Sequence, residues 1–160
     1  MSSFTQFSAL MSMQFCIEAS HELKKDFWLV EEGFRYYIGS LDSGRYIDVP
    51  RHFLTDGASV PFFLQWLIPA WGSYGQAAAL HDYLCENGYC INAATGENIM
   101  LTRKEIDDIF YESMKVLEVE TWRYNLIKAG VETHRAIRRP PVPNVKKNKL
   151  EVQQRYFMAA

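Results

Sequence analysis

The sequence predicts an α+β fold, with a small antiparallel sheet in the N-terminal half followed by about three helices. Two observations indicate this class. The N-terminal half contains short aromatic and β-branched segments separated by turn residues, a pattern typical of strands. The C-terminal half contains longer segments whose apolar residues recur at helical spacing.

Length and composition indicate one domain with a tail. The chain has 160 residues, and we expect a single α+β domain over residues 1–139 and a Pro- and Lys-rich C-terminal tail over residues 140–160. Hydrophobic residues make up 48% of the chain and charged residues 22%, which is enough apolar material for one core. The net charge of −2 gives no general attraction to nucleic acid, so we expect no nucleic-acid partner.

Strands are expected in three segments of the first half, because each is aromatic and β-branched and is bounded by turn residues: 26–32, 34–40 and 44–50. The loops at residues 31–33 and 40–44 have the composition of hairpin turns. A further strand is expected over about residues 7–18. These segments predict a sheet of three or four strands.

An Ala-rich helix is expected over residues 74–86, and Asn87-Gly88 is a typical helix C-terminus. Before it, the Pro- and Gly-punctuated passage predicts a short helix at residues 61–67. After it, residues 90–100 predict a loop or a small hairpin.

A second helix begins at a capping box, in which the Thr102 hydroxyl accepts a backbone N–H and Glu105 reaches back to the cap. Its apolar positions keep helical spacing to about residue 117. A third helix is expected over residues 120–137, and the prolines that follow end it.

The three cysteines are an odd number without metal-type spacing, so we expect reduced thiols. A redox pair of Cys85 and Cys90 is the alternative. The sequence has no apolar run of about 18 residues, and its N-terminus lacks the basic residues of a signal peptide.

Four ionisable residues form the candidate site: Asp56, His81, Asp82 and Asp107. His81 and Asp82 are adjacent on a helix, so their side chains diverge by about 100° and must serve different neighbours. Asp107, on the capping-box helix, is the candidate partner of His81, and its carboxylate would leave the other ring nitrogen free as a base. Asp82 and Asp56 are the candidate ligands of a hard cation such as Ca²⁺.

A base, an orienting carboxylate and a metal would together activate water and stabilise an oxyanion. Each residue also has a structural interpretation. His81 would be a hydrogen-bonded core histidine, Asp56 a turn former, and Asp107 an acid favoured near the start of its helix. From the residues alone, both interpretations stay open.

Three blocks of the sequence, TDGASVP, GSYGQAAALHDYL and RKEIDDIFYESM, occur in this order. Together they resemble the DUF1353 family, small proteins found mostly in tailed bacteriophages and prophages, over residues 27–130. The resemblance implies a phage origin and no particular activity. The chain departs from the family at Cys85, where the family usually has a tyrosine.

The order Asp-Gly-x-Ser, then His-Asp, then Asp-x-x-Phe is also similar to that of small bacterial and fungal phospholipases A2. This resemblance implies a phospholipase A2-like helix pair. It would make His81 the general base, Asp107 its orienting residue, and Asp56 and Asp82 the ligands of Ca²⁺. The spacings here are longer, and the disulfides of those enzymes are missing.

Two functions follow from these resemblances. The first is a structural virion protein, a tail, baseplate or neck component that keeps a phospholipase A2-like site. Its partners would be other phage virion proteins, contacted through the C-terminal tail or the aromatic N-terminal half. The second is an active Ca²⁺-dependent lipid esterase or other envelope-directed hydrolase, with membrane lipid as its substrate. We expect the protein in the host cytoplasm during synthesis and then in the virion.

Two further alternatives have less support. A zinc-dependent peptidoglycan hydrolase would need a second His or a Cys at ligand spacing beside His81. An inhibitor of host defence fits the small size alone.

Overall fold

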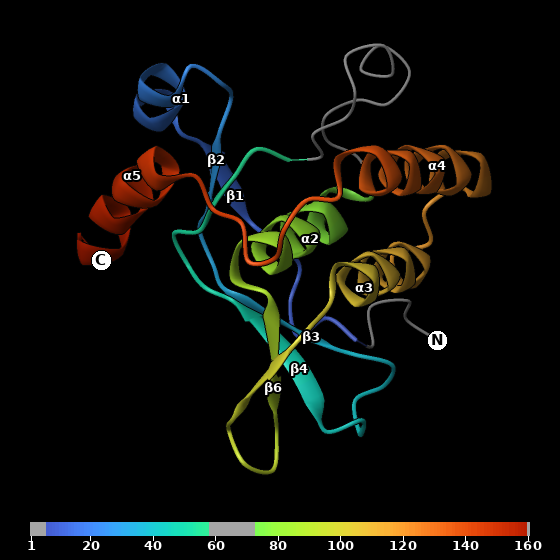
Figure 1. Cartoon of the computed structure of the whole chain (residues 1–160). Helices are drawn as coiled ribbons and strands as arrows, with labels where there is room; N and C mark the ends of the chain where they lie inside the picture. The colour runs from blue at the N-terminus through green and yellow to red at the C-terminus, as the bar shows by residue number, and fades with distance from the viewer. Residues whose placement is uncertain (1–5, 58–72, 160) are drawn as a thin grey trace.

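The computed structural model describes residues 6–57 and 73–159. Within them, two small antiparallel sheets are combined with five helices, which confirms the α+β class (Figure 1). The first sheet has the strand order β1-β2-β5, with bounds Met13–Phe15, Trp28–Val30 and Leu54–Thr55. The second has the order β3-β4-β6-β7, with bounds Phe34–Tyr37, Arg45–Val49, Tyr89–Asn92 and Asn98–Met100. The helices are α1 (Ile17–Leu23), α2 (Gly75–Asn87), α3 (Arg103–Val116), α4 (Thr121–Arg138) and α5 (Lys147–Met158).

The β3–β4 hairpin forms because buried and partly exposed side chains alternate along both strands. Phe34 pairs with Val49 and Tyr36 with Ile47, and all four side chains are buried. The hairpin loop expected at residues 40–44 is therefore confirmed. The small hairpin expected within residues 90–100 is present as β6 and β7.

The hairpin turn expected at residues 31–33 is wrong. Both edges of β2 are already paired, one with β1 and the other with β5, so β3 begins the second sheet instead. Residues 31–33 carry the chain from one sheet to the other. Gly33 suits this crossing, because a Cβ there would lie 3.0 Å from the backbone of both Arg51 and Val49.

The strand expected over residues 7–18 is only partly present, because β1 is short and is followed by α1. Helix α1 has weak local signals. Its N-cap, Cys16, makes no side-chain capping hydrogen bond, and its C-cap, Lys24, takes the left-handed conformation in which glycine is usual. Its position is set by packing, with Ala19 fully buried.

The three expected helices are present as α2, α3 and α4. Gly88 ends α2 at φ 75°, and its N–H donates to the carbonyl of Leu84. The capping box at Thr102 and Glu105 is formed on both sides. The short helix expected at residues 61–67 lies outside the described residues.

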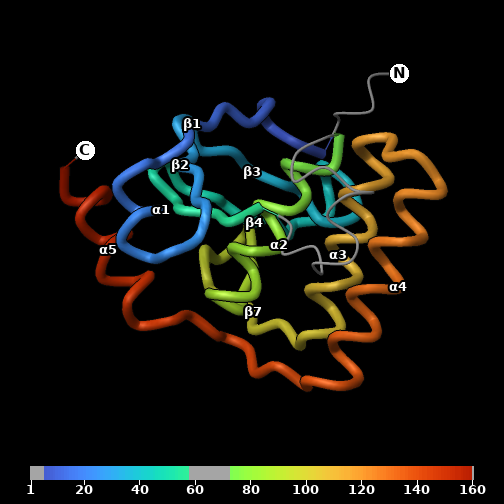
Figure 2. The backbone as a smooth tube through the Cα atoms, turned by 90° about the horizontal axis from the view of Figure 1, so that it is seen from above, coloured from blue at the N-terminus to red at the C-terminus, as the bar shows by residue number. Residues whose placement is uncertain are grey.

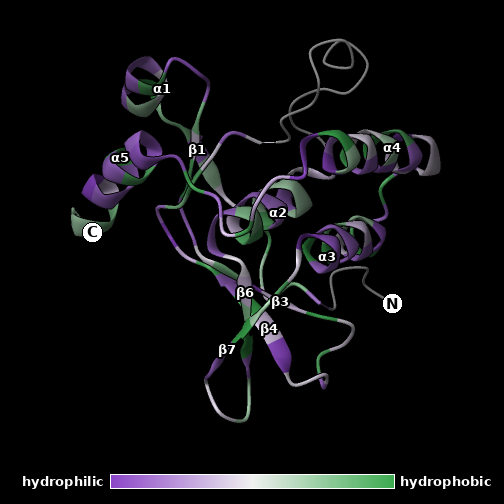
Figure 3. Cartoon of the chain, viewed as in Figure 1, coloured by the Kyte–Doolittle hydropathy of each residue, from purple (hydrophilic) through white to green (hydrophobic). Residues whose placement is uncertain are grey.

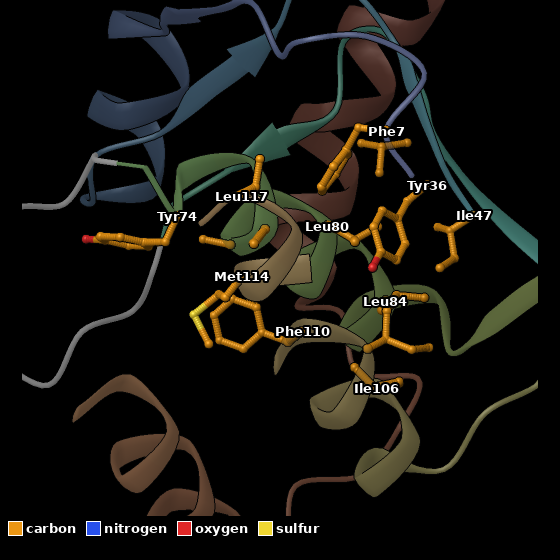
Figure 4. Close-up of a cluster of buried hydrophobic side chains, with 14 of the residues drawn as sticks. Phe7, Tyr36, Ile47, Tyr74, Leu80, Leu84, Ile106, Phe110, Met114 and Leu117 are labelled. Atoms are coloured by element: carbon orange, nitrogen blue, oxygen red, sulfur yellow. The ribbon is translucent and has the colours of Figure 1, made fainter. Parts of the chain in front are cut away.

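The main core lies between α2, α3 and the second sheet. Figure 4 shows Tyr36 of the sheet beside Leu80 of α2, and Leu84 of α2 close to Ile106 of α3. Among the described residues, no helix is long and apolar enough to cross a membrane. The fold thus holds α2 between a sheet and a second helix, which fixes the direction of its side chains.

Helix α5 lies within the segment expected to be a tail. Its Val152 is buried in a second apolar cluster with Ala19, Phe27 and Leu54. Figure 2 shows α5 beside α1 at one side of the molecule and α3 and α4 at the other, with α2 between them. Figure 3 shows α5 as largely hydrophilic, so its docking depends on polar contacts as well as on apolar ones.

Candidate functional site

The centre of the site is a hydrogen bond between α2 and α3. His81 Nε2 lies 2.8 Å from Asp107 Oδ1. The Asp107 side chain is fully buried and the His81 side chain is 15% exposed. Phe110, one helical turn after Asp107, stacks on the imidazole with ring centroids 4.5 Å apart and an interplanar angle of 23°. The ring is therefore held in one orientation by a hydrogen bond and an aromatic face.

Asp107 also binds two arginines. Arg103 Nε donates to Asp107 Oδ1 over 3.1 Å, and Arg135 Nη1 donates to Asp107 Oδ2 over 2.8 Å. Burial alone would raise the pKa of Asp107, but the hydrogen bond from His81 and the positive charge of Arg103 hold that pKa below its usual value. Asp107 is thus a carboxylate at neutral pH.

Burial lowers the pKa of His81, against the opposing effect of its hydrogen bond to Asp107. The imidazole is therefore neutral at pH 7. Since an ionised Asp107 can only accept, the proton of the neutral ring lies on Nε2. The lone pair on Nδ1 is then available to act as a base.

Cys85 lies beside this ring, with its sulfur 3.7 Å from His81 Nε2 and 4.0 Å from Nδ1. Burial raises the pKa of the Cys85 thiol to about 12. It is a thiol at neutral pH, whereas a cysteine nucleophile requires the thiolate. The raised pKa of the thiol therefore does not support a catalytic Cys–His pair.

Asp82 contacts a different part of the fold from His81. Its Oδ2 accepts from the Thr55 hydroxyl over 2.9 Å and from the Asp56 backbone N–H over 3.3 Å. Burial, followed by the charge of Asp56, raises the pKa of Asp82 to about 7. Asp56 itself forms an ion pair with Lys25.

The structure therefore brings the four expected residues into two adjacent groups. His81 meets Asp107 on the α3 side, and Asp82 meets Asp56 at the end of β5. This is the divergence expected of neighbouring positions on one helix. Their catalytic and metal-binding roles stay predictions.

Three residues of the site were not predicted from sequence. Arg103 had a local signal, because it precedes Asp107 by four residues on one helix, the spacing of an ion pair. Arg135 comes from α4, and Lys149 of α5 forms a buried ion pair with Glu86 of α2. No local pattern in the sequence indicates these two contacts.

A family model matches residues 21–131 of this chain, under the description "Protein of unknown function (DUF1353)". The chain belongs to the DUF1353 family. The matched DUF1353 region includes Asp56, His81, Asp82, Arg103 and Asp107, whereas Arg135 and α5 lie beyond it. No curated protein matches the chain, and no solved structure matches it either.

Proposed function

We propose that the α2–α3 pair carries a hydrolytic site in which His81 is the general base and Asp107 orients it. The observation that carries this proposal is the 2.8 Å hydrogen bond between His81 Nε2 and Asp107 Oδ1. It selects the tautomer with a free lone pair on Nδ1. In the proposed reaction, His81 takes a proton from a water molecule as the water oxygen attacks an ester carbonyl carbon. The proton then passes to the leaving alcohol.

The electrostatics of the site support a base that works at neutral pH. The pKa of His81 is lowered, so the imidazole is in its basic form at pH 7. Asp107 is ionised and stabilises the imidazolium that forms during the reaction. The His81 side chain is 15% exposed, so it is not closed off from solvent entirely.

Hydrolysis of short-chain esters tests this proposal. We expect the wild-type protein to hydrolyse p-nitrophenyl butyrate or dihexanoyl phosphatidylcholine, and His81→Asn to lose about 100-fold or more of the rate. His21→Asn, on the surface of α1, is the matched control and should keep the rate. The rate should persist below pH 6.5, because the pKa of His81 is lowered. No turnover by wild type, or equal turnover by His81→Asn, would contradict a His81-dependent hydrolase.

Ca²⁺ is proposed as the metal of Asp56 and Asp82. A calcium ion takes about six to eight oxygen ligands. The described part of the chain contains no group of three or more His, Cys, Asp or Glu residues that could hold a metal ion. Lys25 is also paired with Asp56. Two carboxylates supply fewer oxygen ligands than a calcium ion takes, so the proposed reaction takes no step through a metal.

Calorimetric titration with Ca²⁺ decides this question. Saturable binding to wild type that weakens in both Asp82→Asn and Asp56→Asn would support the ligand pair. Absence of binding to wild type would leave both carboxylates in a structural hydrogen-bond network.

A role as a phage virion component is the second proposed function, with other virion proteins as partners. It is supported by large apolar side chains that remain exposed in the two regions expected to contact them. Phe15 and Ile17 are 44% and 70% exposed near the N-terminus, and Phe157 and Met158 are 38% and 78% exposed on α5. Mass spectrometry of purified particles tests this role. A fixed copy number per particle is expected, and absence from particles would exclude it.

A further inference from the structure

The network around Asp107 carries more positive than negative charge. One carboxylate contacts two guanidinium groups, those of Arg103 and Arg135, so these three side chains together have a net charge of +1. Within residues 6–57 and 73–159, no other carboxylate forms an ion pair with either arginine. The neighbouring lysines are balanced separately, because Lys104 pairs with Asp108 and Lys128 with Glu132. The excess charge therefore lies beside His81.

Both arginines have N–H donors that Asp107 does not use. Arg103 contacts Asp107 through Nε alone, and Arg135 contacts it through Nη1 alone. A guanidinium has about five N–H donors in a fixed plane, so most donors of each arginine are not used by Asp107. The two side chains are 17% and 29% exposed, which leaves them open to a solute.

A buried hydroxyl provides an independent observation. Tyr111 lies one turn after Asp107 on α3 and is 6% exposed, and its hydroxyl has no hydrogen-bond partner in the described part of the chain. Burial, then the charge of Asp107, raises the pKa of Tyr111, so the hydroxyl stays protonated. Arg135 is close enough to act on the same pKa. Because buried polar groups without partners are uncommon in folded proteins, this donor calls for an acceptor.

We propose that Arg103 and Arg135 form a binding site for a phosphate group beside His81. Two guanidinium groups on one carboxylate must lie close together, and their spare N–H groups can bind a single anion from both sides. Phosphate fits this arrangement better than a carboxylate, because it offers more acceptor oxygens for the two donor planes. Excess positive charge in a partly desolvated site also favours an anion that brings more than one negative charge.

This site gives the substrate class of the proposed hydrolase, and in that respect it rests on the proposed function. The substrate would be an ester that also carries a phosphate. The arginines would bind the phosphate and place the ester carbonyl near the water that His81 activates. Phosphate binding itself can be measured without any turnover.

Calorimetric titration with inorganic phosphate tests the site, in sodium chloride at constant ionic strength. We expect saturable binding to the wild-type protein and at least about tenfold weaker binding to Arg103→Gln and Arg135→Gln. Arg138→Gln is the matched control, because Arg138 is exposed on the same helix as Arg135 and makes no ion pair with Asp107. Equal losses in all three variants, or no binding to wild type, would overturn the proposal.

A measurement on the wild-type protein covers the case in which the variants do not fold. The chain has four histidines, and the His81 imidazole signals can be assigned by NMR with His81→Asn. Phosphate should shift the His81 signals and leave those of His21, on α1, unchanged. Shifts of His21 without shifts of His81 would place the anion elsewhere and overturn the assignment.

Two further arms separate the sources of the phosphate. Dihexanoyl phosphatidylglycerol that binds more tightly than inorganic phosphate, with the same dependence on Arg103, would identify a lipid headgroup. Equal affinity would identify a free or soluble phosphate ester, which also supports the site. The substrate p-nitrophenyl butyrate carries no phosphate. Loss of its hydrolysis in His81→Asn therefore tests the proposed hydrolase independently of the phosphate site.

Discussion

Single residues of α2 show how one helix can serve two separate networks. His81 and Asp82 are adjacent, yet one contacts Asp107 on α3 and the other contacts Thr55 and Asp56 at β5. The divergence of about 100° between neighbouring helical positions makes this possible. The two networks also differ in charge, because Asp107 meets two arginines while Asp82 lies near another carboxylate. Each network leads to its own prediction.

Asp107→Asn should lower the free energy of unfolding by about 3 kcal/mol, since it leaves the arginines without their carboxylate. Urea denaturation at pH 7 measures this change. Asp108→Asn is the matched control, because Asp108 is 52% exposed and pairs with Lys104 on the surface. It should change stability by less than about 0.5 kcal/mol. Similar losses in the two variants would show that the buried network contributes no more to stability than a surface ion pair.

Asp82 should make the protein less stable as the pH rises from about 4 to about 7. In the folded protein its pKa is raised to about 7, whereas an unfolded Asp has a pKa of about 3.9. Between these values the folded state binds more protons than the unfolded state, so the free energy of unfolding falls with increasing pH. Asp82→Asn removes this effect. The free energy of unfolding of Asp82→Asn, measured relative to that of wild type, should therefore increase by on the order of 2 kcal/mol between pH 5 and pH 8. Parallel pH curves from thermal denaturation would contradict this prediction.

At the scale of elements, the end of α2 is held against the chain that leads to α5. Gly88 takes φ 75°, and a Cβ at this position would lie 2.9 Å from Val142 Cγ1. The N–H of Asn144 donates to the carbonyl of Cys85 over 2.9 Å. The segment before α5 thus packs directly on the C-terminal turn of α2, and only glycine satisfies both the conformation and the contact.

Gly88→Ala should therefore destabilise the protein by about 2–3 kcal/mol, through left-handed strain and the contact with Val142. Gly96→Ala separates the two effects. Gly96 has φ 72° but no atom within 4 Å of a Cβ, so its replacement should cost about 1 kcal/mol. Chemical denaturation of both variants measures the difference. A smaller loss at Gly88 than at Gly96 would contradict close packing at residue 142.

The elements that could be predicted from sequence are those with local signals. The capping box at Thr102 and the cap at Gly88 mark helix ends through residues a few positions apart, and the hairpin at residues 40–44 has the same property. Helices α1 and α5 lack such signals. Each is stabilised by packing on the other and on β5, which a local pattern does not reveal. The turn at residues 31–33 was mistaken because its composition says nothing about which strands are already paired.

The contacts of the site also differ in whether the sequence could predict them. The contact of His81 with Asp107 was predicted from helical geometry and motif order. The contact of Arg103 with Asp107 could have been predicted, because the two residues are four positions apart on one helix. Arg135 could not have been predicted, because it lies 28 residues from Asp107 and reaches it from another helix. Tertiary packing alone makes it part of the site.

At the scale of the whole molecule, α5 packs beside α1 and also contacts α2 and β5. Lys149 forms a buried ion pair with Glu86, and its ammonium lies 4.7 Å from the ring centroid of Phe53. The Gln153 side chain accepts from the backbone N–H of Leu54 over 2.9 Å. These contacts connect α5 to α2 and β5, the elements that position Asp82 and Asp56.

Lys149→Gln should release α5, because it leaves Glu86 buried without its cation. Limited proteolysis should then cut residues 140–158 at least about tenfold faster than in wild type. Lys147→Gln is the matched control, since Lys147 is 91% exposed and lies 3.9 Å from Glu151. It should leave the cleavage rate unchanged. Unchanged cleavage in Lys149→Gln would show that α5 is held by its apolar face alone.

The pairing of α1 with α5 has a consequence for synthesis on the ribosome. The Cys16 thiol and the Tyr156 hydroxyl lie 3.0 Å apart in the folded chain but are separated by 140 residues in the sequence. At about 5–20 residues per second, on the order of 10 s pass between the emergence of these two residues. During that interval Val152 is missing from the apolar cluster that it forms with Ala19, Phe27 and Leu54. The apolar cluster and Glu86 therefore lack their α5 partners until α5 has left the ribosome, and a chaperone that binds apolar segments would find its target there.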